Sequence, residues 1–111
     1  MKIFEQVAAK DFEQRVTLEV RKHSADRCSS MDDAALSEFT RYGIERAKTY
    51  GIVSETDVCK YLSVMLALGK DFDRDPRYPW ATKTLADPTL GAPGARVSRL
   101  AAEALGVGGG E

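Results

Sequence analysis

Residues 54–69, SETDVCKYLSVMLALG, decide the fold of this chain. Ser54 followed three residues later by Asp57 is the pattern of a helix N-terminal cap, with the acid at the positive end of the helix dipole. Residues 64–68 are apolar on almost every side, which is typical of a helix surrounded by other helices. The final glycine of the stretch is placed to end the helix. We therefore predict a central helix over residues 55–68, whose core positions are Val58, Tyr61, Leu62 and Met65.

Two further helices are predicted upstream of this stretch. In the first, over residues 8–24, apolar residues recur at spacings of three and four, which indicates one buried stripe. The second begins at a cap formed by Ser30 and Asp33 and ends at Gly51. Its stripe includes Gly43, and because glycine lowers helix propensity by about 1 kcal/mol, we expect a close helix–helix approach there to offset the loss. The stripe residues are Ala9, Phe12, Val16 and Val20 in the first helix and Leu36, Phe39, Gly43, Ala47 and Tyr50 in the second.

The sequence after the central helix predicts two more helices. Residues 70–79 form a loop, and its last residue, Pro79, suits the first position of a short helix that runs from Trp80 to about Ala86. Residues 88–94 are rich in proline and glycine, which indicates a second break. A fifth helix follows, with Val97, Leu100, Ala101 and Ala104 on one side.

Taken together, these patterns predict an all-α fold: a small orthogonal bundle of about five helices, with residues 1–105 as a single domain and residues 106–111 as a flexible glycine-rich tail. The chain has 111 residues, of which 43% are hydrophobic and 30% charged, as expected for a globular domain. The 16 Lys and Arg residues against 17 Asp and Glu give a net charge of −1, which argues against non-specific binding to nucleic acid. No apolar run approaches the roughly 18 residues of a membrane-spanning helix, and the N-terminus turns polar too soon for a signal peptide.

Cys28 and Cys59 are the two cysteines of the chain. A secreted scaffold of this size usually carries more, so we expect reduced thiols and a cytoplasmic location. Cys59 falls in the central helix, where a thiol packs as a small hydrophobe. A disulfide, or a metal site that includes His23, is the alternative. His23 lies near the C-terminal end of the first helix, where its charged form favours the helix dipole, so a structural role is expected.

Residues 70–77, KDFDRDPR, which we call the charged loop, hold the densest group of charges in the chain. Asp71, Asp73 and Asp75 alternate as the first ligands of a calcium loop do. The rest of that pattern fails, because Pro76 stands where glycine is needed and Thr82 where a bidentate glutamate is needed. We therefore predict turn hydrogen bonds and ion pairs with the neighbouring arginines, and neither a metal nor a cofactor.

Catalytic motifs are missing from the sequence. It has one histidine, His23, and no nucleophilic serine elbow, zinc-protease motif, CxxC pair or glycine-rich phosphate loop. The glycines of residues 106–110 precede no helix that could bind an anion. We therefore expect that the protein is not an enzyme.

Residues 47–62, AKTYGIVSETDVCKYL, resemble a helix–turn–helix arrangement: a small residue, a glycine four positions later, a short turn and a capped helix. A helix that reads DNA needs exposed basic and amide side chains. This one offers Lys60 beside two acids and then becomes apolar. A DNA-binding regulator is therefore the alternative function, and binding to another protein is the preferred one.

Three aromatic residues, Phe72, Tyr78 and Trp80, lie within nine residues of one another beside acids and arginines. Trp, Tyr and Arg are the residues that most often anchor protein interfaces. In a competing interpretation Trp80 caps the core, and both hold if Trp80 packs inward while Phe72 and Tyr78 face the partner. Residues 1–7 are a second candidate docking element. The predicted partner-binding residues are Asp71, Phe72, Asp73, Arg74, Asp75, Arg77, Tyr78 and Trp80.

Residues 41–88 resemble a family of small bacterial proteins. Its members share an RYGIxRAxxYGI segment, a DVxxYLxxMxxLG helix and a DFDxDPxxPWA loop, all of which this chain contains. Their genes lie beside components or effectors of type VI secretion systems, the contractile injection machines of Gram-negative bacteria. The resemblance covers a little under half of the chain and implies a cytoplasmic accessory role, as an adaptor, an effector chaperone or an immunity-like partner. It implies no catalytic residues.

Overall fold

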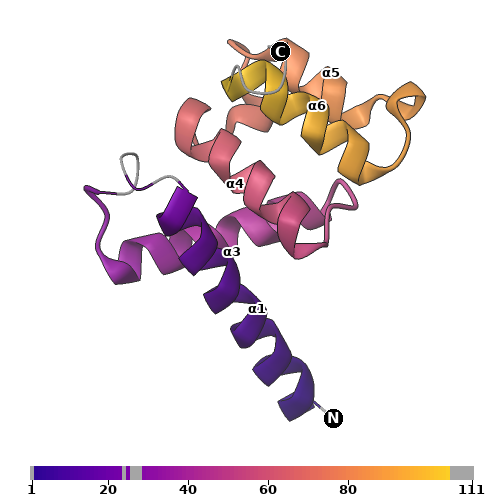
Figure 1. Cartoon of the computed structure of the whole chain (residues 1–111). Coiled ribbons are helices and arrows are strands. Elements are labelled where there is room, and N and C mark those ends of the chain that lie inside the picture. Colours follow the sequence, from indigo (N-terminus) through magenta and orange to yellow (C-terminus); the bar gives the residue numbers. More distant parts are fainter. Residues whose placement is uncertain (1, 24, 26–28, 106–111) are drawn as a thin grey trace.

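Helix α4 lies in the middle of the structure, in contact with three other helices (Figure 1). The computed structural model describes the backbone of residues 2–23, 25 and 29–105, and the side chains of residues 11–23, 25 and 29–104. Within these ranges there are five α-helices and no strand, so the predicted all-α bundle is confirmed. The elements are α1 (Lys2–His23), α3 (Asp33–Lys48), α4 (Glu55–Leu68), the 3-10 helix η1 (Phe72–Arg74), α5 (Pro79–Ala86), the 3-10 helix η2 (Pro88–Leu90) and α6 (Pro93–Leu105).

The predicted bounds of α4 are confirmed. Ser54 accepts a hydrogen bond on its hydroxyl from the backbone N–H of Asp57, at 3.2 Å, and Gly69 ends the helix with a positive φ of 118°. Helices α1, α3 and α6 pack around α4, and the four predicted core residues are all buried, together with Val64. Within α4, Thr56 alone is exposed.

The two helices on the N-terminal side differ from the prediction at their starts. Helix α1 begins at Lys2, ahead of the start predicted at residue 8, so the residues before that start continue the helix. Helix α3 is capped by Asp32, whose carboxylate accepts from the backbone N–H of Ala35 at 2.8 Å. The prediction of a cap at Ser30 is therefore wrong, because the aspartate stands at the correct distance before the first turn of this helix.

Gly43 marks the closest approach of α3 to α4. A methyl group at this position would overlap Leu62 Cδ2 and lie 2.8 Å from Met65 Sδ. The prediction that this glycine permits close helix packing is confirmed, and the contact explains why a residue unfavourable to helices stands in the middle of α3.

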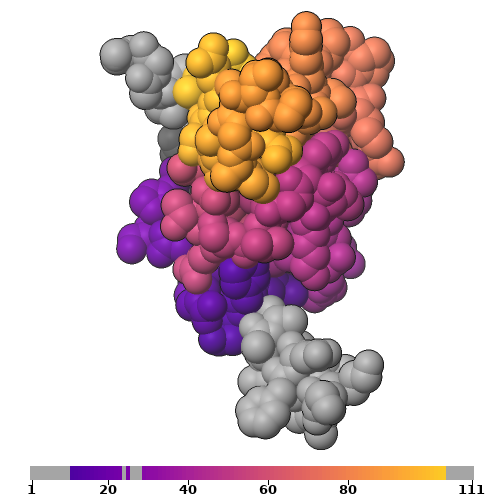
Figure 2. All heavy atoms as spheres, turned by 90° about the vertical axis from the view of Figure 1, so that its right-hand side faces the viewer, coloured from indigo at the N-terminus to yellow at the C-terminus, as the bar shows by residue number. Residues whose placement is uncertain are grey.

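The C-terminal helices form the other side of the structure. Helix α5 packs against α6, and α6 packs against α4 through its predicted apolar face, of which Val97, Leu100 and Ala101 are buried. Figure 2 shows α6 and the segment before it at the top, α4 and the end of α3 in the middle, and α1 at the bottom.

Three predictions fall on residues outside those described. They concern the thiol of Cys28, the glycine-rich tail of residues 106–111 and the docking role of the side chains of residues 1–7.

Candidate functional site

The side chain of Asp73, in the middle of the charged loop, lies inside the molecule. It is 1% exposed, and its Oδ2 accepts hydrogen bonds from Arg46 Nη2 and from the Tyr50 hydroxyl, the latter at 2.7 Å. The backbone carbonyl of Asp73 accepts from the hydroxyl of Thr82 in α5. Asp73 therefore connects three segments: the end of α3, the charged loop and α5.

Aromatic rings surround this ion pair. The ring centroid of Tyr61 lies 5.2 Å from that of Phe72 and 6.3 Å from that of Tyr50. Burial and the hydrogen bond to Asp73 raise the pKa of Tyr50 to about 12. Burial and the negative charge of Asp73 also raise the pKa of Tyr61. Both phenols are therefore neutral at physiological pH, and the charge balance of the cluster depends on Arg46 and Asp73 alone.

Three buried polar atoms of this cluster have no hydrogen-bond partner among the described residues. They are Asp73 Oδ1, Arg46 Nε and the Tyr61 hydroxyl oxygen. Burying polar atoms without a partner costs free energy. The hydrogen bonds that Asp73 Oδ2 accepts from Arg46 and Tyr50 are the interactions of the cluster that offset this cost.

Asp71 ties the start of the charged loop to the outer side of α3. Its Oδ1 accepts from the Tyr42 hydroxyl and from Arg74 Nη2, the latter at 3.0 Å, and these two hydrogen bonds lower the pKa of Asp71. Tyr42, Arg46 and Tyr50 are spaced four residues apart, so they follow one line along α3 and the turn after it. Their side chains donate hydrogen bonds to Asp71 and Asp73 of the charged loop.

The prediction that Phe72 and Asp73 contact a partner is wrong for the structure described. Both side chains are buried, with exposed fractions of 0% and 1%. Phe72 packs on Tyr61, and the carboxylate of Asp73 is used by Arg46 and Tyr50. They hold the charged loop in place and do not contribute to its outer surface.

The exposed part of the predicted site consists of arginines and aromatic rings. The side chains of Arg74 and Arg77 are 60% and 73% exposed, and the Arg77 guanidinium lies 5.3 Å above the ring of Tyr78. The half-buried rings of Tyr78 and Trp80 meet edge to face at 6.2 Å. Trp80 also packs against the core, as the competing interpretation predicts, and its contact with a partner stays a prediction. We call Arg74, Arg77, Tyr78 and Trp80 the Arg–aromatic surface.

Asp75 orients the most exposed of these residues. Its carboxylate accepts from Arg77 Nη2 at 2.8 Å and from the backbone N–H of Arg77 at 2.9 Å, which lowers the pKa of Asp75. A planar guanidinium held by a carboxylate and stacked on a ring loses little further freedom on binding.

The three aspartates of the calcium-like pattern do not converge on one point. Asp71 faces Tyr42 and Arg74, Asp73 faces Arg46 and Tyr50, and Asp75 faces Arg77. In the described part of the chain, no group of three or more His, Cys, Asp or Glu residues could hold a metal ion.

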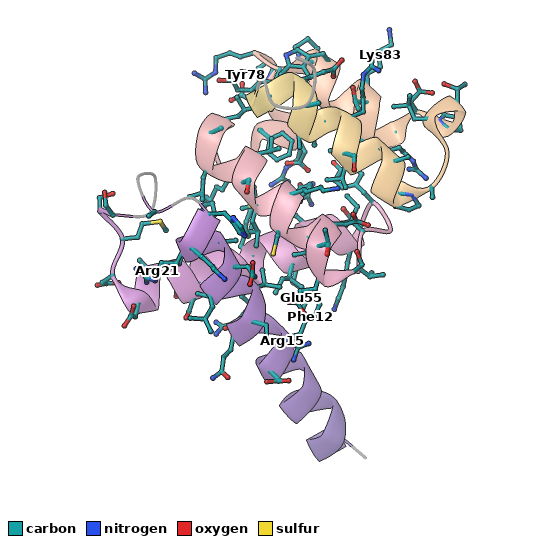
Figure 3. The ribbon with its side chains drawn as sticks, in the orientation of Figure 1. Phe12, Arg15, Arg21, Glu55, Tyr78 and Lys83 are labelled. Carbon is teal, nitrogen blue, oxygen red and sulfur yellow. The ribbon has the colours of Figure 1, made fainter. Side chains whose placement is uncertain are left out.

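A groove of about 300 Å³ lies between α1 and α4 and is lined by Glu19, His23, Glu55, Cys59 and Lys60, among others. His23 pairs with Glu19 at 3.1 Å. Cys59 is a free thiol, and burial together with two nearby glutamates raises its pKa to about 11. A thiol that stays protonated is a poor nucleophile. Figure 3 shows Arg15 of α1 beside Glu55, and these residues pair at 2.8 Å on the same side of the molecule.

Helix α4, the candidate DNA-reading helix, offers little to a DNA groove. Its single lysine, Lys60, donates to the Ser98 hydroxyl of α6 at 2.8 Å. Thr56 is the one exposed residue of α4, and the side of α4 that lines the groove beside α1 carries Glu55 next to that lysine, which is not the basic surface that a DNA-reading helix needs.

Comparison of the chain with protein-family models, with curated proteins and with solved structures finds no match. In the described part of the chain, no helix is both long and apolar enough to span a bilayer. Residues 41–52 contact the charged loop, since Tyr42, Arg46 and Tyr50 bind Asp71 and Asp73.

Sequence reasoning did not single out Tyr42 and Arg46, and it placed Tyr50 and Tyr61 on buried helix faces without assigning them to this site. The signal that could have found three of them is their spacing. Side chains that donate hydrogen bonds recur every four residues from Tyr42 to Tyr50. A row of donors with this spacing can bind the carboxylates of the charged loop, which stand at every second residue.

Proposed function

We propose that the protein is a non-enzymatic interaction module whose Arg–aromatic surface binds another protein. The observation that carries the proposal is the contrast within residues 71–80. Phe72 and Asp73 are anchored in the interior, while Arg77 projects outward above the ring of Tyr78, which meets Trp80 edge to face, and the exposed Arg74 pairs with Asp71. Figure 3 shows Tyr78 at the end of the molecule that lies opposite α1.

The chemistry of this surface supports binding to a protein. Arginine, tyrosine and tryptophan are the residues in which binding energy concentrates at protein interfaces, because they bury a large area and retain directional polar groups. The Asp75–Arg77 pair adds one negative and one positive charge at the edge of this surface. Such charges raise the rate of association and fix the orientation of the partner more than they add to the affinity.

The resemblance extends the proposal to a biological setting. In it, the protein is a cytoplasmic accessory protein of a bacterial type VI secretion or related injection system, acting as an adaptor, an effector chaperone or an immunity-like partner. The partner is then a component or an effector of that system.

The test is a co-purification with identification of the captured protein by mass spectrometry, followed by binding measurements with both proteins purified. We expect wild type to capture an injection-system protein and Arg77→Ala to weaken that complex about tenfold or more, as loss of an interface anchor does. Arg99→Ala is the matched control, because Arg99 is an exposed arginine on α6 that pairs with Glu103 at 3.3 Å.

Two results would contradict the proposal. One is an Arg77→Ala variant that binds the identified partner as tightly as wild type does. The other is salt-sensitive binding of wild type to duplex DNA in mobility shifts at low ionic strength, which would favour the regulator.

A further inference from the structure

The outer face of α3 carries four exposed charges of alternating sign: Glu38, Arg41, Glu45 and Lys48. The side chains of Arg41, Glu45 and Lys48 are 60%, 65% and 57% exposed. The opposite face of α3 holds its buried residues, Leu36, Thr40, Gly43 and Ala47, and packs on the core. The charged face therefore points away from the core.

A groove of about 530 Å³ runs beside these charges. Its apolar lining comes from Met31, Phe39 and Tyr42, which pack against the core on one side and are open on the other. Lys70 lies at its edge, with its ammonium group 5.1 Å above the Tyr42 ring. Glu38, Arg41 and Glu45 also line this groove, so apolar and charged groups belong to one surface.

The order of the charges is self-complementary. Positions 38 and 48, and positions 41 and 45, lie symmetrically about residue 43. When two copies of α3 run antiparallel about a two-fold axis at that level, Glu38 of one copy lies opposite Lys48 of the other, and Arg41 lies opposite Glu45. A parallel pair in register would instead place like charges together, which is unfavourable.

We propose that this face of α3 binds the same face of a second copy of the chain, antiparallel and about a two-fold axis near residue 43. Tyr42 lines the groove one residue from the level of the axis, so the two-fold axis brings the two grooves, each with its Tyr42 side chain, to the same flank of the helix pair. Opposed charges on both sides of the axis set the register. The proposal goes beyond the proposed function. Its one link to the Arg–aromatic surface is the hydrogen bond of 3.1 Å from Arg74 Nη2 to the Tyr42 hydroxyl, and Arg77, Tyr78 and Trp80 take no part in it.

The four side chains are available for such contacts. Among the described residues Glu38 has no hydrogen-bond or ion-pair partner, and Glu45 and Lys48 share one exposed contact at 3.4 Å, which contributes little. Arg41 uses Nε and Nη2 to bind Glu13 of α1, both at 3.3 Å, and so retains Nη1 for the second copy.

The charge balance favours a second copy over a highly charged ligand. With two charges of each sign, the face produces no net field that would attract nucleic acid or a strongly acidic or basic peptide. An antiparallel copy of α3 instead places a charge of opposite sign across from each of the four charged residues.

The test is a charge exchange followed by sedimentation velocity of the full chain. We expect wild type to dimerise with increasing concentration, and Arg41→Glu and Glu45→Arg each to lower the association constant at least tenfold, because each places like charges opposite each other. An equimolar mixture of the two variants should form a heterodimer, since both 41–45 pairs are then opposite in sign. The double variant, with both substitutions in one chain, should again form a homodimer.

Circular dichroism verifies that each variant is folded, and Arg99→Glu on α6 is the control that should leave dimerisation unchanged. The proposal is overturned if wild type stays monomeric up to about 1 mM, where even weak association is visible. It is also overturned if the single variants dimerise as wild type does, or if mixing them fails to produce the heterodimer. Arg77→Ala should not alter dimerisation, so this result is independent of the proposed function.

Discussion

At the scale of single residues, the carboxylate of Asp73 carries a charge into the interior and shares one oxygen between Arg46 and Tyr50. Removing a charge from water costs several kcal/mol, and the attraction of a close, hydrogen-bonded partner offsets that cost. The pair therefore adds little net stability, but the loss of either partner leaves the other unpaired in a poorly solvated place.

We predict that Asp73→Ala lowers the free energy of unfolding by about 3 kcal/mol, in the range for breaking a buried ion pair. Asp75→Ala, which removes a carboxylate paired with the exposed Arg77, should have a much smaller effect, because solvent screens a pair at the surface. Urea denaturation of both variants measures the difference. Equal effects at the two positions would contradict the role assigned to Asp73.

We also predict that the fold loses stability at alkaline pH through Tyr50. A tyrosine in the unfolded chain has a pKa of about 10, whereas burial and the bond to Asp73 raise that of Tyr50 to about 12 in the folded chain. The unfolded state releases its proton first as pH rises, so the contribution of neutral Tyr50 is complete below about pH 10 and is lost between about pH 10 and 12. In Tyr50→Phe, the free energy of unfolding should fall less steeply over that range, and an unchanged slope would contradict this account.

At the scale of elements, the charged loop and α3 fit each other in two ways. The line from Tyr42 to Tyr50 supplies donors to Asp71 and Asp73, while Gly43, on the buried side of the same helix, lets α3 approach α4. One helix thus positions both the central helix and the loop that precedes α5.

We predict that Gly43→Ala destabilises the protein by about 1–3 kcal/mol, although alanine is the better helix former. The added methyl group meets Leu62 and Met65, and overpacking of this kind outweighs the gain of about 1 kcal/mol in helix propensity. Ser37→Ala, a half-exposed position of the same helix, should change stability by less than about 0.5 kcal/mol. Thermal unfolding of the two variants checks the prediction, and a stabilised Gly43→Ala would show that α3 does not approach α4 so closely.

The elements could be predicted from the sequence more fully than the site. Helix α4 and the start of α5 follow from Ser54, Gly69 and Pro79, because caps and proline act within one turn of the chain. Asp73 is buried against Arg46 and Tyr50, more than 20 positions away, and Phe72 packs on Tyr61 of α4. Local patterns do not contain that information. The charge density of the loop therefore predicted that the whole loop is exposed, whereas Phe72 and Asp73 hold it to the interior.

At the scale of the whole molecule, α4 is the element that α1, α3 and α6 share, and the charged loop adds a polar connection between α3 and α5. The 16 basic and 17 acidic residues of the chain nearly cancel in number, and the fold places many of them in ion pairs. Some ion pairs of the described residues are local and lie on the surface, such as Arg77–Asp75 and Arg99–Glu103. The Arg46–Asp73 pair, like Arg15–Glu55, joins segments distant in sequence. The N-terminal and C-terminal sides are therefore joined both through the apolar core and through this pair.

The position of Trp80, the one tryptophan of the chain, has a practical consequence. Its indole is half-buried beside Tyr78, on the C-terminal side, so its fluorescence emission reports the packing of α5, whereas far-ultraviolet circular dichroism reports all helices together. Because both sides share α4, the two spectroscopic signals should change at the same denaturant concentration, as in a two-state transition. Ligand titrations can then follow the same emission without a label, since any protein that covers the neighbouring arginines would alter the solvent around the indole.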